Sequence, residues 1–165
     1  MIFKFLSKNF YISFSIVALI YFLDRLSKIY AIQLDKNNLG SDIFNSAYLN
    51  IVLIWNKGIA FGLLSFNESH LYNILSLIIS IIVVILVILS IKSKGFKRYS
   101  LLMIVGGALG NLHDRIFFNA VPDFIDFHVG NFHWFIFNVS DIFITLGVIS
   151  MIVLELADNK IEKTK

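Results

Sequence analysis

The sequence predicts an all-α membrane protein with four transmembrane helices and a small extracytoplasmic β-like element between the first two. Of its 165 residues, 58% are hydrophobic and only 15% are charged, and the mean hydropathy is +0.80. These values lie outside the usual range of soluble domains. Apolar runs of about 20 residues, the length that crosses a bilayer as a helix, also recur along the chain.

The predicted spans cover residues 10–32, 70–91, 99–118 and 134–157. The second of them carries no formal charge. The first continues into "YFLDRLSK" without a small-residue cleavage site, so we expect a retained helix rather than a cleaved signal peptide. With one proline and no low-complexity linker, residues 1–165 are expected to form a single integral domain.

The positions of the basic residues predict the orientation in the membrane. Nine of the 14 Lys and Arg residues precede the first span, join spans two and three, or follow the fourth. By the positive-inside rule this side is cytoplasmic, so both termini are expected inside. The net charge of +3 therefore indicates sidedness and not a nucleic-acid partner. The nine residues are Lys4, Lys8, Lys92, Lys94, Lys97, Arg98, Lys160, Lys163 and Lys165.

The connection at residues 33–69 contains "YLNIVLIW", which is rich in β-branched and aromatic residues. This stretch is too short to cross a bilayer as a helix, and its composition predicts a strand-like element at the membrane surface. Its aromatic side chains suit the headgroup layer.

Four polar clusters interrupt this apolar chain, and all map to the outer end of the spans. They are "DRLSK" (24–28), "WNKGIAFG" (55–62), "GNLHDR" through "VPDF" (110–124) and "FNVSD" (137–141). Charged side chains in membrane segments cost several kcal/mol and usually face the protein interior or a water-filled site. One polar site assembled from all four clusters explains them most simply.

Helical spacing indicates which side chains meet. Asn111 and Arg115 share a face near the end of span three, and Asn138, Asp141 and Thr145 share one at the start of span four. Asp123 follows span three and can reach the depth of Asp141. Two adjoining carboxylates share a proton and supply one acid and one base, as in aspartic proteases.

Other chemistries fit less well. No HExxH pattern is present, and His128 and His133 lie five residues apart, which does not suit one helix face, so no metal and no cofactor are expected. Ser27 and Lys28 are adjacent and would point in different directions on a helix. The alternatives left open are a small ion- or proton-coupled transporter and a non-catalytic membrane assembly protein.

The motifs "DRLSK", "NKGIAFG", "GGALGNLHDR", "VPDF" and "FNVSD", in this order over about residues 20–150, resemble those of the lipoprotein signal peptidases, the type II signal peptidases of bacteria. The resemblance implies a multi-pass aspartyl endopeptidase of the bacterial cytoplasmic membrane, with its active site near the extracytoplasmic face. It also implies that the substrates are prolipoproteins carrying a diacylglyceryl group, that membrane lipids surround the enzyme, and that the enzyme is monomeric and needs no cofactor.

Carried over by motif, Asp123 and Asp141 would form the catalytic dyad. The residues expected to bind substrate or to support the dyad are Asp24, Lys28, Asn56, Gly58, Asn111, Arg115 and Asn138.

Four further positions, in or near the matched motifs, have no assigned catalytic role. Asp114 matches the "DR" position with a less defined role, and Asp126 lies outside the motifs and is expected to be structural, pointing opposite Asp123 along a strand. The chain departs from the usual pattern at Ser140 and Ile59, where the family usually has Ala.

Overall fold

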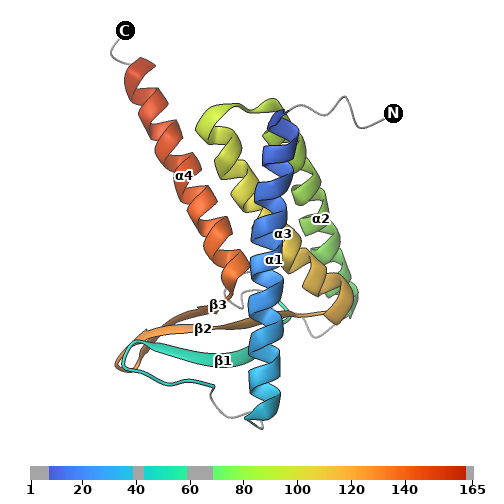
Figure 1. Cartoon of the computed structure of the whole chain (residues 1–165), viewed down its shortest axis with the longest axis vertical. Helices are drawn as coiled ribbons and strands as arrows, with labels where there is room; N and C mark the ends of the chain where they lie inside the picture. Colours follow the sequence, from blue (N-terminus) through green and yellow to red (C-terminus); the bar gives the residue numbers. More distant parts are fainter. Residues whose placement is uncertain (1–7, 39–42, 59–68, 163–165) are drawn as a thin grey trace.

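The computed structural model describes residues 8–38, 43–58 and 69–162, which form four long helices and one three-stranded sheet (Figure 1). In chain order the elements are α1 (Lys8–Asn37), β1 (Leu49–Asn56), α2 (Ser69–Lys92), α3 (Gly95–Phe118), β2 (Val121–Val129), β3 (Phe132–Phe137) and α4 (Val139–Glu162).

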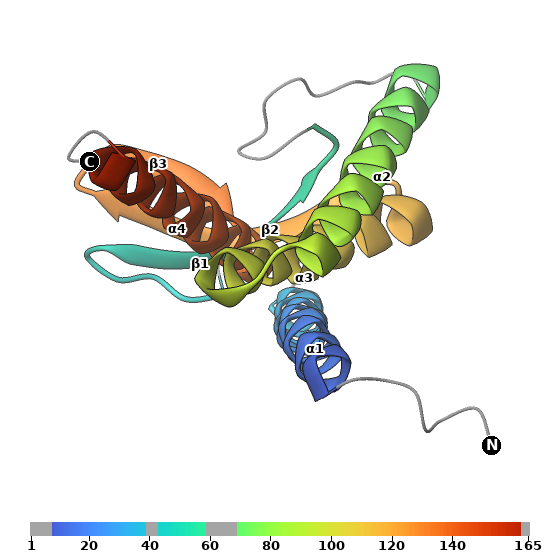
Figure 2. The same ribbon diagram turned by 90° about the horizontal axis from the view of Figure 1, so that it is seen from above.

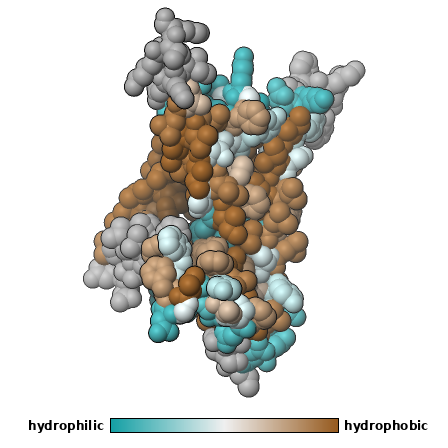
Figure 3. Space-filling model, turned by 90° about the vertical axis from the view of Figure 1, so that its left-hand side faces the viewer, coloured by the Kyte–Doolittle hydropathy of each residue, from teal (hydrophilic) through white to brown (hydrophobic). Residues whose placement is uncertain are grey.

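All four helices are long and apolar enough to cross a membrane, which confirms the predicted fold class. One end of the bundle contains the start of α1, the connection between α2 and α3, and the end of α4 (Figure 1). The sheet lies at the other end. We call these the far end and the sheet end. Hydrophobic side chains cover the middle of the bundle on the face seen in Figure 3, and hydrophilic ones gather toward its two ends.

Helix α3 is the central helix. It lies among α1, α2 and α4 when the bundle is viewed along its length (Figure 2), and half of its apolar window is buried, against 11% in each of the other helices. Glycines allow this close packing: a Cβ added at Gly107 would lie 2.5 Å from the Ser140 carbonyl oxygen, and one at Gly106 would lie 2.9 Å from Ile20 Cβ. The pair Gly106 and Gly110 therefore serves helix packing.

The sheet is antiparallel, with strand order β1, β2, β3. Strand β1 confirms the strand-like element expected in "YLNIVLIW". Strands β2 and β3 form a hairpin closed by Gly130 and Asn131, and Gly130 has a φ of +58°, which glycine adopts without steric strain.

The hairpin differs from the sequence prediction, which began the fourth span at residue 134. Residues 132–137, "FHWFIF", form strand β3, and α4 begins only at Val139. The run from 134 onward is apolar without a break before Asn138, so hydropathy alone merges the strand with the helix that follows it.

Candidate active site

The four polar clusters meet where the sheet joins the helices. Asp123 lies on β2, Asp141 in the first turn of α4, Asn56 at the end of β1, and Asn111 on α3. Each of these four side chains is at least 91% buried. Polar groups buried to this extent require hydrogen-bond partners, and these residues supply them to one another.

Both carboxylate oxygens of Asp123 accept hydrogen bonds from amides. Asn138 Nδ2 donates to Oδ1 at 2.6 Å, and Asn56 Nδ2 donates to Oδ2 at 2.9 Å. Burial nevertheless raises the pKa of Asp123 to about 6, with a further rise from the charge of Asp141, because the two amides and Lys28 only partly offset these effects. Asp123 thus keeps its proton to a higher pH than an exposed carboxyl group does.

Asp141 accepts hydrogen bonds at the start of α4. Its Oδ2 accepts the Asn138 backbone N–H at 3.1 Å, while its own N–H donates to Asn138 Oδ1 at 3.1 Å. This reciprocal pair is a capping arrangement at the helix N-terminus, where negative charge is favoured. Asn111 Nδ2 donates to Oδ1 at 2.8 Å. Both carboxylate oxygens of Asp141 therefore accept a hydrogen bond, which fixes the orientation of the side chain.

The side chain of Asn138 connects the Asp123 carboxylate to the backbone of Asp141. Its amide nitrogen bonds Asp123, its amide oxygen accepts the backbone N–H of Asp141, and the side chain is fully buried. An amide flipped by 180° would place an oxygen against the Asp123 carboxylate. The Asn138 amide therefore has one favourable orientation, which fixes both acids relative to each other.

A buried charge network between α1 and α3 supports this arrangement. Lys28 Nζ lies 2.7 Å from Asp114, 3.0 Å from Asp24 and 2.8 Å from Asn111 Oδ1. Arg25 pairs with the same two carboxylates, at 2.5 Å from Asp114 and 2.8 Å from Asp24. Two cations face two anions, so the network is balanced, as buried charges must be.

This network also reaches α4 directly. Asp24 Oδ1 accepts the Ser140 backbone N–H at 3.0 Å, which links α1 to the turn that carries Asp141. The Ser140 side chain is fully buried and its Oγ has no hydrogen-bond partner. The hydroxyl that distinguishes Ser140 from Ala therefore makes no bond to either carboxylate.

Arg115 holds the end of β1 in place. Its Nη2 donates to the Gly58 carbonyl oxygen at 2.7 Å and its Nη1 to that of Asn111 at 3.3 Å. The Gly58 N–H donates in turn to Asn56 Oδ1 at 2.7 Å, which directs the Asn56 amide nitrogen toward Asp123. Ile59, the other departure from the family pattern, lies outside the described residues.

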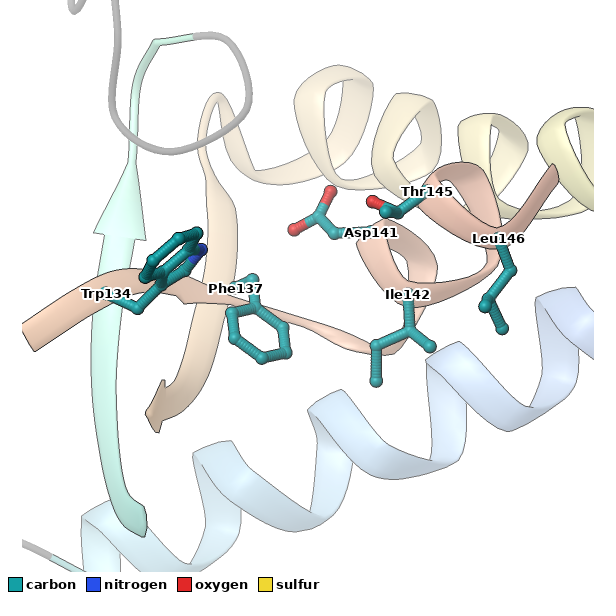
Figure 4. A pocket seen from close by; sticks show the side chains of 6 residues that line it. All are labelled: Trp134, Phe137, Asp141, Ile142, Thr145 and Leu146. Atoms are coloured by element: carbon teal, nitrogen blue, oxygen red, sulfur yellow. The ribbon is translucent and has the colours of Figure 1, made fainter. Parts of the chain in front are cut away.

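A largely apolar pocket of about 260 Å³ opens beside Asp141 (Figure 4). In Figure 4 the Asp141 carboxylate and the Thr145 hydroxyl lie side by side, one helical turn apart, and the rings of Trp134 and Phe137 both lie on the side of Asp141 away from Thr145. The lining residues are Trp134, Phe137, Asp141, Ile142, Thr145 and Leu146.

Comparison with known proteins decides the family. The family profile of signal peptidase (SPase) II matches residues 16–157, most of the chain. The chain belongs to the signal peptidase II family. It is therefore a peptidase, and its four apolar helices agree with a multi-pass bacterial membrane protein.

Relatives and solved structures agree with this membership in signal peptidase II. The lipoprotein signal peptidase of Pelagibacter ubique is 45% identical over 152 residues, covering 92% of both chains. That of Anaplasma phagocytophilum is 44% identical over 137 residues, covering 81% of this chain and 85% of its own. A bacterial membrane enzyme solved by the in meso method has a TM-score of 0.74 at 30% identity, covering 93% of this chain and 92% of its own.

The structure of this signal peptidase II brings together every site residue named from the sequence, and it adds three that the sequence analysis missed. The sequence gives Arg25 no role beyond its place in the "DRLSK" cluster, although the adjacent Asp24 is a signal for a buried ion pair. Trp134 and Phe137 were assigned to the fourth span. Among the described residues, no group of three or more His, Asp or Glu side chains is placed to bind a metal ion.

Proposed function

We propose that the chain is a membrane aspartyl endopeptidase that removes signal peptides from diacylglyceryl-modified prolipoproteins. Membership of the signal peptidase II family and relatives named lipoprotein signal peptidase support the substrate class. The observation that carries the mechanism is the single Asn138 side chain that bonds both Asp123 and Asp141.

The two carboxylates have different surroundings and therefore different roles. Asp141, which accepts two N–H groups at a helix N-terminus, is the ionised general base. Asp123, whose pKa is raised to about 6 by burial and by the charge of Asp141, is the proton-bearing acid. Two interacting carboxylates share one proton, so this assignment describes the dominant form of the pair.

Hydrolysis follows from these roles. Asp141 accepts a proton from a water molecule as the water oxygen bonds to the scissile carbonyl carbon, and Asp123 donates its proton to the carbonyl oxygen. The tetrahedral intermediate then collapses, its hydroxyl proton returns to Asp123, and Asp141 gives the proton it holds to the leaving nitrogen. Both carboxyl groups end in their starting protonation states.

Charge and geometry together support the proposed position in the membrane. Lys92, Lys94 and Lys97 lie at the far end of the bundle, and the dyad lies at the sheet end. Under the positive-inside rule the far end is cytoplasmic, and the site faces the outer surface of the bacterial cytoplasmic membrane. The transporter alternative is disfavoured because the buried charges gather at the sheet end.

Turnover of a diacylglyceryl-modified precursor by the purified protein in detergent tests the proposal. We expect release of the intact signal peptide, identified by mass spectrometry, with the new N-terminus at the lipid-bearing cysteine. A properly folded preparation that leaves this precursor uncut would overturn the proposed function.

A further inference from the structure

We propose that the β2–β3 hairpin holds a second site, unrelated to the dyad, at which His128 and His133 bind a divalent transition-metal ion such as Zn²⁺. The site lies at the closed end of the hairpin, where the two histidines are register partners on neighbouring antiparallel strands. A separation of five residues does not suit one face of a helix, but these two histidines do not lie on a helix. On a hairpin, residues five apart on either side of a two-residue turn stand opposite each other.

The two histidine rings lie close to each other. Their centroids are 4.9 Å apart with an interplanar angle of 48°, so the rings are tilted and not stacked flat. An ion bonded to one nitrogen of each ring at about 2.0–2.1 Å requires those nitrogens to be near neighbours. Neutral imidazole is the usual ligand of Zn²⁺, Cu²⁺ and Ni²⁺.

His133 already has the outer partner that metal-binding histidines usually have. Its Nδ1 lies 2.9 Å from Asp126 Oδ2 and 3.1 Å from Oδ1. A carboxylate can only accept a hydrogen bond, so Nδ1 carries the proton and the Nε2 lone pair stays available. Asn50 Nδ2, at 3.4 Å from the same carboxylate, helps to hold it.

The surroundings of His128 give a second, independent reason to place an ion between the two rings. Its side chain is 92% buried, yet neither ring nitrogen has a hydrogen-bond partner. A buried polar group without a hydrogen-bond partner is destabilising. Binding of an ion between the rings satisfies one of these nitrogens, and the half-exposed His133 side chain leaves the ion a path from solvent.

The site is open and has two protein ligands. No third acidic or histidine ligand lies close enough within the described residues, so water must complete the coordination and the affinity must be lower than that of a structural four-ligand zinc site. The ion would link β2 to β3. Because β2 carries Asp123 and Asn138 directly follows β3, such a link would stiffen the hairpin that positions both carboxylates.

Calorimetric titration of Zn²⁺ into the whole protein in detergent tests this site. The protein must be purified without a polyhistidine tag and treated with EDTA beforehand. We expect one saturable site per chain, and a thermal unfolding midpoint that rises with Zn²⁺ and falls again with EDTA. Absence of saturable binding up to millimolar Zn²⁺ would overturn the proposal.

Variants locate the ion. His128→Gln and His133→Gln should each abolish saturable binding, and Asp126→Asn should weaken it about 10- to 100-fold because it removes only the outer partner. His70→Gln, at an exposed histidine on α2, is the matched control and should bind as the wild type does. Wild-type binding in either hairpin histidine variant would contradict the paired site, whatever the variant's peptidase activity.

Discussion

At the scale of single residues, the site depends on amide groups that hold the two acids in place. Asn138 and Asn56 each donate one hydrogen bond to Asp123, and Asn111 donates one to Asp141. None of these amides can titrate, so they fix geometry without adding charge. The protonation of the pair is then set by burial and by the nearby cations.

The first prediction concerns the two carboxylates themselves. Asp123→Asn and Asp141→Asn should each lower the cleavage rate by about 100- to 10,000-fold, because each change removes one half of an acid–base pair. Membrane accumulation of both variants should match the wild type. Asp126→Asn is the control: its carboxylate bonds His133 and Asn50 instead of the dyad, so most activity should remain. Wild-type rates in Asp123→Asn would refute the dyad.

The second prediction concerns pH. Asp123 must carry its proton to act as the acid, and its raised pKa of about 6 means that this proton is lost as pH rises, so kcat/KM should fall above about pH 6. Asn56→Ala removes a donor that stabilises the carboxylate. The pKa should rise further, and the alkaline limb should move to higher pH.

The matched control for this pH shift is Asn50→Ala on the same strand, because the Asn50 amide bonds Asp126 and not Asp123. Its pH profile should coincide with that of the wild type. A limb that moves to lower pH in Asn56→Ala, or moves equally in both variants, would show that the Asn56 amide does not set the acid's pKa.

At the scale of helices and strands, close packing of α3 against α4 places Asp141 within reach of Asn111. The third prediction is that Gly107→Ala destabilises the protein by about 1–3 kcal/mol, although alanine is the better helix former, because the new Cβ would meet the Ser140 carbonyl oxygen. Thermal unfolding in detergent measures this change. Ala157→Ser, at an exposed position on α4, should leave the midpoint unchanged.

The helices were predictable from the sequence because hydropathy over about 20 residues identifies a span directly. The hairpin was not, since the signal of two short strands is weak and the apolar run "WFIF" at the end of the second strand merges with the span that follows. The motif residues could be named one by one. Their pairing could not: that Lys28 contacts Asn111, and Arg25 contacts Asp114, depends on how α1 crosses α3, which no local pattern encodes.

At the scale of the whole molecule, charge separates the two ends of the bundle. The fourth prediction is that the far end lies in the cytoplasm. The chain contains no cysteine, so single replacements at Lys94 and Asn38 give unambiguous labelling sites. A membrane-impermeant thiol reagent added to intact spheroplasts should label Asn38→Cys and not Lys94→Cys. Labelling of both sites from outside, or of Lys94→Cys alone, would invert or disprove the proposed topology.

The last prediction joins the membrane to the chemistry. The dyad lies where the helices meet the sheet, and its neighbouring pocket is walled by apolar side chains, among them Trp134 and Leu146. A diacylglyceryl group that stays in the bilayer would hold the scissile bond at this depth, so positioning would supply much of the rate. We expect kcat/KM for a precursor without the lipid to be at least about 100-fold lower in the same detergent, with Asp141→Asn as the blank. Equal cleavage of the two precursors would instead indicate a membrane aspartyl protease that recognises the peptide alone.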